Sequence, residues 1–204
     1  GPLVEVNGKL YFSAGDRDEY GRELWVTDGT ESGTEMVVNL NDNATNNGEA
    51  GVSRLFGDGD LVYFAAEDVH ENGYEPWVYD TTAPVSSTNP QMLMDVYTGQ
   101  NNGVSGTHSP GFTKAGDSVI FFAQQDGFSN LDLYVTDGTP DGTSLIVDFG
   151  TGIGPSDFSG SITFNGEAYF AADIPAPNEY NCPKDALWKT DGTVEGTVVV
   201  ASCI

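Results

Sequence analysis

Apolar and polar residues alternate over short stretches along the whole chain, and no stretch has the 3.6-residue period of an amphipathic helix. One Tyr-Phe phrase occurs four times, at Leu10–Ala14, Val62–Ala66, Ile120–Gln124 and Ala168–Ala172. A second phrase follows each copy and centres on an aromatic anchor, which is Trp25, Trp77, Tyr134 or Trp188. The anchors are 52, 57 and 54 residues apart, so the chain consists of four copies of one unit.

Each copy predicts four short strands with turns between them. A weak first strand precedes the Tyr-Phe strand, a variable polar loop leads to the anchor strand, and an Asp-Gly-Thr turn leads to the last strand. Four strands in about 50 residues, repeated four times, are typical of β-propeller blades. The sequence therefore predicts an all-β, four-bladed β-propeller as one domain over residues 1–204. Its repeats span approximately residues 1–42, 53–98, 109–150 and 155–204.

The second copy departs from this pattern after its anchor strand. Copies one, three and four continue with Asp-Gly-Thr and then Gly-Thr, and the carboxylates of Asp28, Asp137 and Asp191 are expected to cap the turn. Copy two replaces the Gly-Thr turn with the segment Thr81–Pro90 and reaches its last strand later.

The phrase Glu-Leu-Trp-x-x-Asp-Gly-Thr-x-x-Gly-Thr at Glu23–Thr34 resembles the ELWxxDGT repeat. The resemblance is near-complete in copies one and three, whereas copy two has Pro76 for Leu and copy four has Ala186 for Glu. The resemblance implies a secreted or cell-surface protein built from propeller-like repeats. It implies the location and the architecture of the protein, and it implies no catalytic or ligand-binding activity.

Charge excludes several classes of partner. The chain has 204 residues with 7 Lys and Arg against 31 Asp and Glu, a formal net charge of −24. Seven scattered cations form no basic surface for nucleic acid, and the same charge balance disfavours binding to anionic membranes.

No apolar run approaches the roughly 18 residues of a transmembrane segment. No signal peptide is visible at residues 1–9, which indicates a cytosolic protein or a processed one.

The loop before each anchor strand is acidic, and calcium prefers clusters of such oxygen ligands. The candidate metal ligands are Asp16, Asp18, Glu23, Glu67, Asp68 and Glu71. The alternative is that these loops carry only solvated charge.

Copy four holds both cysteines, Cys182 and Cys203, which are expected to form a disulfide in a secreted protein. The alternative is a pair of free thiols.

Asn43 lies in an Asn-Ala-Thr sequon and is a candidate glycosylation site. The variable loop of each copy contains one aromatic residue: Tyr20, Tyr74, Phe128 and Tyr180. Together these residues are candidates for a partner-binding rim, and the alternative is that each anchors its own loop against the blade.

No nucleophile and base pair is recognisable, so no catalytic residue is assigned and the chain is predicted not to be an enzyme. The sequence favours a secreted binding or scaffold module, stabilised by calcium, whose partner is a protein, a glycan or a further copy of itself. One alternative is a structural subunit of a surface assembly or of a larger complex. Another is a carbohydrate-binding module or a glycoside hydrolase, because 31 acidic residues always allow some pair at a catalytic distance.

Overall fold

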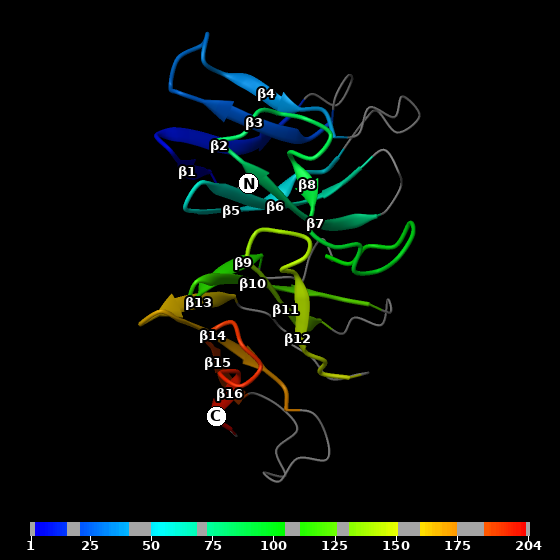
Figure 1. Cartoon of the computed structure of the whole chain (residues 1–204), viewed down its shortest axis with the longest axis vertical. Coiled ribbons are helices and arrows are strands. Elements are labelled where there is room, and N and C mark those ends of the chain that lie inside the picture. Colours follow the sequence, from blue (N-terminus) through cyan, green and yellow to red (C-terminus); the bar gives the residue numbers. More distant parts are fainter. Residues whose placement is uncertain are drawn as a thin grey trace. The chain divides into compact units, whose positions relative to one another are not determined.

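The structure, a computed structural model, describes residues 3–15, 21–40, 50–68, 73–104, 111–125, 131–150, 160–174 and 186–202. The chain divides into two compact units, Gly1–Asn102 and Gly103–Ile204. Each unit contains two four-stranded antiparallel sheets in which successive strands are neighbours (Figure 1). That residues 1–204 form a single domain stays a prediction.

The first unit holds the sheets of copies one and two, called blade 1 and blade 2. Blade 1 consists of β1 (Val4–Val6), β2 (Lys9–Ala14), β3 (Glu23–Thr27) and β4 (Glu35–Val38). Blade 2 consists of β5 (Ser53–Asp58), β6 (Leu61–Glu67), β7 (Tyr74–Asp80) and β8 (Gln91–Met92).

The second unit holds blade 3 and blade 4. Blade 3 consists of β9 (Phe112–Ala115), β10 (Ser118–Ala123), β11 (Asp132–Thr136) and β12 (Ser144–Val147). Blade 4 consists of β13 (Ser161–Phe164), β14 (Glu167–Ala172), β15 (Ala186–Thr190) and β16 (Val198–Ala201).

The core of the first unit lies between blades 1 and 2. Successive side chains of a strand point to opposite faces, so the Tyr and the Phe of each Tyr-Phe phrase serve different sides of the sheet. Blade 1 contributes the buried side chains of Tyr11, Leu24 and Val26, and blade 2 contributes those of Val62, Phe64 and Trp77. The ring centroids of Tyr11 and Tyr79 lie 6.0 Å apart across this junction.

The second unit repeats this junction with equivalent residues. Blade 3 contributes Ile120, Phe122 and Leu133, and blade 4 contributes Ala168, Phe170 and Trp188. The rings of Phe122 and Phe170 meet edge to face with their centroids 5.1 Å apart. In both units the same two blade faces meet, which is how successive propeller blades stack.

Strand pairing corrects the third copy of the Tyr-Phe phrase by one residue. Tyr134 pairs with Phe121, just as Trp77 pairs with Phe64 and Trp188 with Phe170. The third copy is therefore Val119–Ala123, and the predicted Ile120–Gln124 was wrong. A slip of one residue exchanges the two faces of a strand, and the run Ile120-Phe121-Phe122 is apolar in either register, so periodicity alone did not distinguish them.

The prediction of an all-β fold with four propeller blades is confirmed: four repeats form four four-stranded antiparallel sheets. No helix long and apolar enough to span a membrane occurs in the described part of the chain.

Candidate functional site

Four of the predicted site residues lie within the described ranges: Glu23, Glu67, Asp68 and Tyr74. The others lie outside the described residues: Asp16, Asp18, Tyr20, Asn43, Glu71, Phe128, Tyr180, Cys182 and Cys203. Among the described residues, no group of three or more His, Cys, Asp or Glu side chains is placed to hold a metal ion.

Glu23 begins β3 and is completely buried. Its carboxylate accepts hydrogen bonds from the backbone N–H groups of Leu40, at 3.1 Å, and Ala50, at 3.3 Å. Both donors belong to the connection between blades 1 and 2. These contacts favour a structural role, in which the carboxylate fixes the chain that leaves the blade.

The same role recurs in the next two blades. The buried carboxylate of Glu75 accepts the N–H of Val96 at 3.0 Å, and that of Asp132 accepts the N–H of Phe149 at 3.0 Å. Blade 4 has Ala186 at this position. The acidic residue of the repeated phrase therefore caps backbone donors after the fourth strand in three blades.

Tyr74, a candidate for partner binding, is fixed by internal hydrogen bonds. Its hydroxyl donates to the carbonyl oxygen of Gly51, so the hydroxyl of Ser53, 2.5 Å away, is left to donate to it. Its backbone N–H donates to Asn102 Oδ1 at 2.9 Å. This geometry favours the alternative that Tyr74 anchors its loop.

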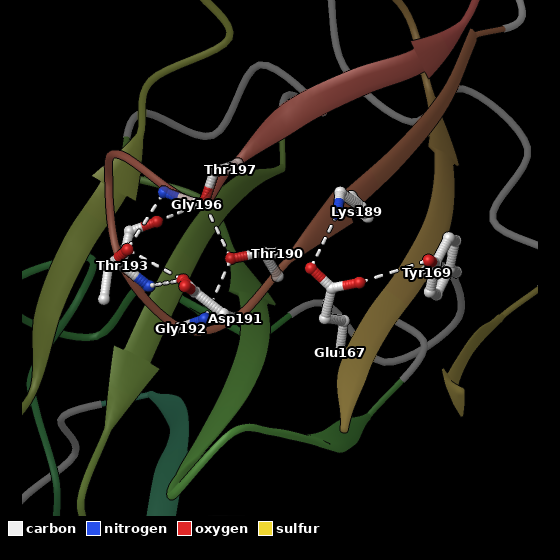
Figure 2. A network of polar contacts seen from close by, with 9 residues as sticks. All are labelled: Glu167, Tyr169, Lys189, Thr190, Asp191, Gly192, Thr193, Gly196 and Thr197. Atoms are coloured by element: carbon white, nitrogen blue, oxygen red, sulfur yellow. Dashed lines mark hydrogen bonds and ion pairs between the residues drawn. The ribbon is translucent and has the colours of Figure 1, made fainter. Parts of the chain in front are cut away.

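The Asp-Gly-Thr turn of blade 4 is a closed chain of hydrogen bonds (Figure 2). Asp191 Oδ1 accepts the N–H and the hydroxyl of Thr193 at 2.9 and 2.7 Å, and the Thr193 hydroxyl accepts the N–H of Gly196 at 2.9 Å. The Thr197 hydroxyl donates to the Thr193 carbonyl, so the proton between Thr190 and Thr197 belongs to Thr190. Every hydroxyl thus donates once and accepts at least once.

The equivalent turns of blades 1 and 3 repeat these distances within 0.1 Å. The hydrogen bond from the Thr193 side chain, followed by that from its backbone, lowers the pKa of the Asp191 carboxyl. Thr30 lowers the pKa of Asp28 in the same way. These three turns serve the fold, as the sequence predicts for their carboxylates.

Copy two closes the corresponding turn differently. Asp80 Oδ1 still accepts the N–H and hydroxyl of Thr82, at 2.8 and 2.7 Å. The second half of the network is replaced by the side chain of Asn89. Asn89 Oδ1 accepts the N–H of Asp80, and Asn89 Nδ2 donates to the Asp80 carbonyl, both at 2.9 Å. A single side chain therefore holds the ends of the longer Thr81–Pro90 segment together.

This segment forms one wall of a pocket of about 340 Å³ inside the first unit, here called the repeat-two pocket. The end of β4 with the residues after it, Asp68, β7 and β8 form the rest. Its polar lining residues are Asn39, Asp68, Ser86, Ser87, Thr88 and Gln91. Its apolar lining residues are Val38, Leu40, Trp77, Pro90 and Met92.

Several lining groups are held in place by the contacts already described. Glu23 fixes Leu40 through its N–H at 3.1 Å. The indole Nε1 of Trp77 donates to the carbonyl oxygen of Ala66 at 3.1 Å, which leaves the ring carbons for the pocket wall. Asp68 is only 6% exposed. Hydrogen bonds therefore hold two of the lining residues, Leu40 and Trp77, in place.

One lining residue, Asn39, carries a side-chain oxygen that is closed off from solvent. Asn39 Oδ1 is buried, and nothing in the described part of the chain donates to it. A buried acceptor without a donor costs about 1–3 kcal/mol. The sequence showed that copy two departs from the pattern, and it placed Asp68 among candidate ligands. It gave no signal for Asn39, because Asn39 reaches the pocket only through the packing of blades 1 and 2.

No family model matches this chain, and no curated protein matches it. Solved structures do resemble it in fold. Oligopeptidase B from Leishmania major has a TM-score of 0.55 at 13% identity, covering 98% of this chain and 26% of the other. The acylaminoacyl peptidase of Pyrococcus horikoshii has a TM-score of 0.55 at 10% identity, covering 98% and 26%.

Prolyl oligopeptidase B from Galerina marginata also has a TM-score of 0.55, at 12% identity over 100% of this chain and 31% of the other. This chain thus spans about a quarter to a third of the length of these peptidases. The similarity involves their β-propeller domains. It defines the class of this protein as one with a β-propeller fold, and at such identities it shows the fold alone.

Proposed function

We propose that this chain is a secreted, non-enzymatic β-propeller module that binds a partner through the repeat-two pocket. The observation that carries the proposal is the departure of copy two. Three blades close their anchor turn with the same hydrogen-bond network, whereas blade 2 replaces half of it with Asn89 and a longer segment. Regular repeats serve stability, and an insertion in one repeat that walls a pocket is a typical place for binding.

The ELWxxDGT resemblance supports the secreted part of the proposal. The expected disulfide between Cys182 and Cys203 and calcium binding by the acidic loops belong to the same proposal. The chemistry of the pocket supports recognition: it combines an indole face and aliphatic side chains with amide, hydroxyl and carboxylate groups. Such mixed linings fix the orientation of a bound group.

The proposal is tested by probing peptide and glycan arrays with the wild-type chain and with Ser87→Trp. Ser87 is exposed at the pocket wall, so a Trp there fills the entrance without entering the core. Ser32→Trp, at an equally exposed turn of blade 1, is the matched control. Binding should be lost in Ser87→Trp and retained in Ser32→Trp. Absence of any ligand on both arrays, or equal binding by both variants, would overturn the proposal.

A second candidate function, a subunit of a surface assembly, is favoured by one face of blade 4. Ile162 and Val198 lie in one cross-strand row with Tyr169 and Lys189, and directly opposite residues share a face. Ile162 is 68% exposed and Val198 41%. In the middle of the face, Lys189 Nζ forms an ion pair with Glu167 at 2.7 Å (Figure 2).

Apolar side chains around a polar centre are typical of surfaces that associate. Sedimentation of the wild-type chain and of Ile162→Lys tests this candidate. A multimer that Ile162→Lys dissociates would support it. A monomer at all concentrations would exclude self-assembly through this face.

A further inference from the structure

We infer that one face of blade 4 docks against one face of blade 1 in a second copy of this chain. The inference rests on the second candidate function, self-association through blade 4, and names the surface that receives blade 4. It follows from the way in which the blades of each unit cover one another, and from the residues on the two faces that no blade covers.

The junction inside each unit follows one rule. Successive residues of a strand point to opposite faces of the sheet. One face of each blade holds the Tyr of the Tyr-Phe phrase or its equivalent, here called the Tyr face, and the other holds the Phe and the aromatic anchor, here called the Phe face. The Tyr face of blade 1 packs against the Phe face of blade 2. The Tyr face of blade 3 packs against the Phe face of blade 4 in the same way.

The Tyr face of blade 4 has no strand of its own unit over it. Ile162 is 68% exposed and Phe164 61%. The rings of Phe164 and Tyr169 meet edge to face on this surface, with their centroids 5.8 Å apart. Their equivalents in blade 1, Val6 and Tyr11, are only 3% and 4% exposed, because blade 2 covers them. Blade 4 therefore exposes apolar side chains at positions that are covered in blade 1.

The Phe face of blade 1 is the matching uncovered surface in the first unit. Phe12 pairs with Trp25, and Trp25 pairs with Met36. All three are only partly buried, and Leu10 beside them is 39% exposed. Blade 2 carries the same three residue types in the same pairing on the face that covers blade 1: Phe64, Trp77 and Met92. Blade 1 thus presents the kind of surface that already covers a Tyr face in this chain.

The residues of blade 4 resemble the Tyr face that such a surface covers. Tyr169 and Leu187 of blade 4 repeat Tyr11 and Leu24 of blade 1 at the same register positions. Ala171, opposite Leu187, is small, as is its counterpart in blade 1. The junction between blades 1 and 2 is therefore a template for the contact between blade 4 and blade 1 of a second copy.

One charged residue distinguishes the Tyr face of blade 4 from its template. Lys189 stands where blade 1 has Val26. Its Nζ forms an ion pair with Glu167 Oε1 at 2.7 Å, and the Tyr169 hydroxyl donates to Glu167 Oε2 at 3.2 Å (Figure 2). Both charges therefore enter the contact already paired, and an unpaired charge is what makes burial most costly.

A contact between two different faces has a consequence that a self-complementary contact lacks. A face that docks on its own copy gives a two-fold dimer, in which the other face plays no part. When the Tyr face of blade 4 docks on the Phe face of blade 1, each chain uses one face to give and one to receive. Altering either face alone should then prevent association, and two differently altered chains should complement each other.

The test is analytical ultracentrifugation of the wild-type chain and of one variant for each face. Ala171→Arg places a charge on the Tyr face of blade 4, and Leu10→Arg places one on the Phe face of blade 1. Both positions are exposed, so both variants should fold, which circular dichroism checks. Each variant alone should associate at least about a hundredfold more weakly, because the contact would bury a charge without a partner.

An equimolar mixture of the two variants should form a dimer with one chain of each kind, since each supplies the face that the other lacks. Val194→Arg is the control, because Val194 is 63% exposed in a turn of blade 4, and it should associate as the wild type does. Copies with a net charge of −24 repel each other at long range, so association should strengthen as salt is added.

Each other result identifies what fails. Wild-type association that Leu10→Arg leaves unchanged would overturn the inference and leave self-association through blade 4 intact. A mixture of the two variants that stays monomeric would overturn the inference as well. A wild-type chain that is monomeric at all concentrations, at low and at high salt, would overturn both the inference and the second candidate function. Binding through the repeat-two pocket is tested separately by the arrays.

Discussion

Replacing the buried carboxylate of Glu23 tests how the blades are joined. Glu23→Ala removes both oxygens that accept the N–H groups of Leu40 and Ala50, at 3.1 and 3.3 Å. Glu23 is 0% exposed and Ala50 1%, so water does not readily replace the lost acceptor. A hydrogen bond to a charged group contributes about 1.5–3 kcal/mol. Because the second bond is long, we expect a total loss of about 3–4 kcal/mol.

That loss is a large part of the stability of a typical domain, about 5–15 kcal/mol. Glu23→Gln keeps one acceptor oxygen and should lose about 1–3 kcal/mol, which keeps the prediction measurable if the Ala variant does not fold. Glu5→Ala is the control, because its exposed carboxylate accepts one backbone N–H, that of Gly8, at 2.7 Å. It should cost less than about 1 kcal/mol.

Urea denaturation followed by circular dichroism measures these differences through the midpoint at constant slope. The order of stability should be wild type, Glu5→Ala, Glu23→Gln and then Glu23→Ala. The differences in stability between these variants should be the same with calcium and with chelator, since the Glu23 carboxylate accepts hydrogen bonds from backbone N–H groups. The reasoning would be refuted if Glu23→Ala cost no more than Glu5→Ala. A cost that appears only in calcium would instead make Glu23 a metal ligand.

Three further predictions concern the turns and the acidic loops. Gly33→Ala would place a Cβ atom 2.0 Å from Asp28 Oδ1. The carboxylate must then release Thr30, and we expect a loss of about 1–3 kcal/mol in urea denaturation, whereas Ser32→Ala should change little. Asp191 has a lowered pKa, so the stability it contributes is present above the unfolded pKa of about 3.9 and is lost as the pH falls through the folded pKa. The melting temperature of Asp191→Asn should therefore fall less steeply below about pH 4 than that of the wild type, and parallel pH profiles would contradict this. If the acidic loops bind calcium, a hundredfold excess over Kd adds about 2.7 kcal/mol, so the melting temperature should be several degrees higher in calcium than in chelator; identical melts would leave the loops as solvated charge.

Much of the fold was predictable because it depends on local chemistry. The Asp-Gly-Thr turns form within a few residues, and the same hydroxyl and carboxylate groups recur at the same spacing. Four alternating stretches in each copy predicted four strands, and the structure has them. The register of the third Tyr-Phe strand was not predictable, because Ile120, Phe121 and Phe122 are apolar on both faces and only pairing with Tyr134 fixes it.

The candidate site was predictable only in part. Acidic composition drew attention to Glu23 as a metal ligand, but its burial and its contacts with Leu40 and Ala50 depend on the connection to the next blade. Tyr74 was found as a loop aromatic, yet its hydroxyl contacts Gly51 and Ser53 across the fold. Residue type showed which groups were chemically available, and it did not show which of them were already satisfied.

The sequence by itself determined the repeat, the blade and the turn, because strand alternation and turn hydrogen bonds act over a few residues. It also marked copy two as the repeat that differs. Only the tertiary structure decided what that difference does. Asn39 and Ser87 are far apart in the chain, and the packing of blade 1 against blade 2 brings them into one pocket. The lack of a donor for Asn39 Oδ1 within the described chain is likewise a property of that packing, since burial depends on neighbours that no local pattern specifies.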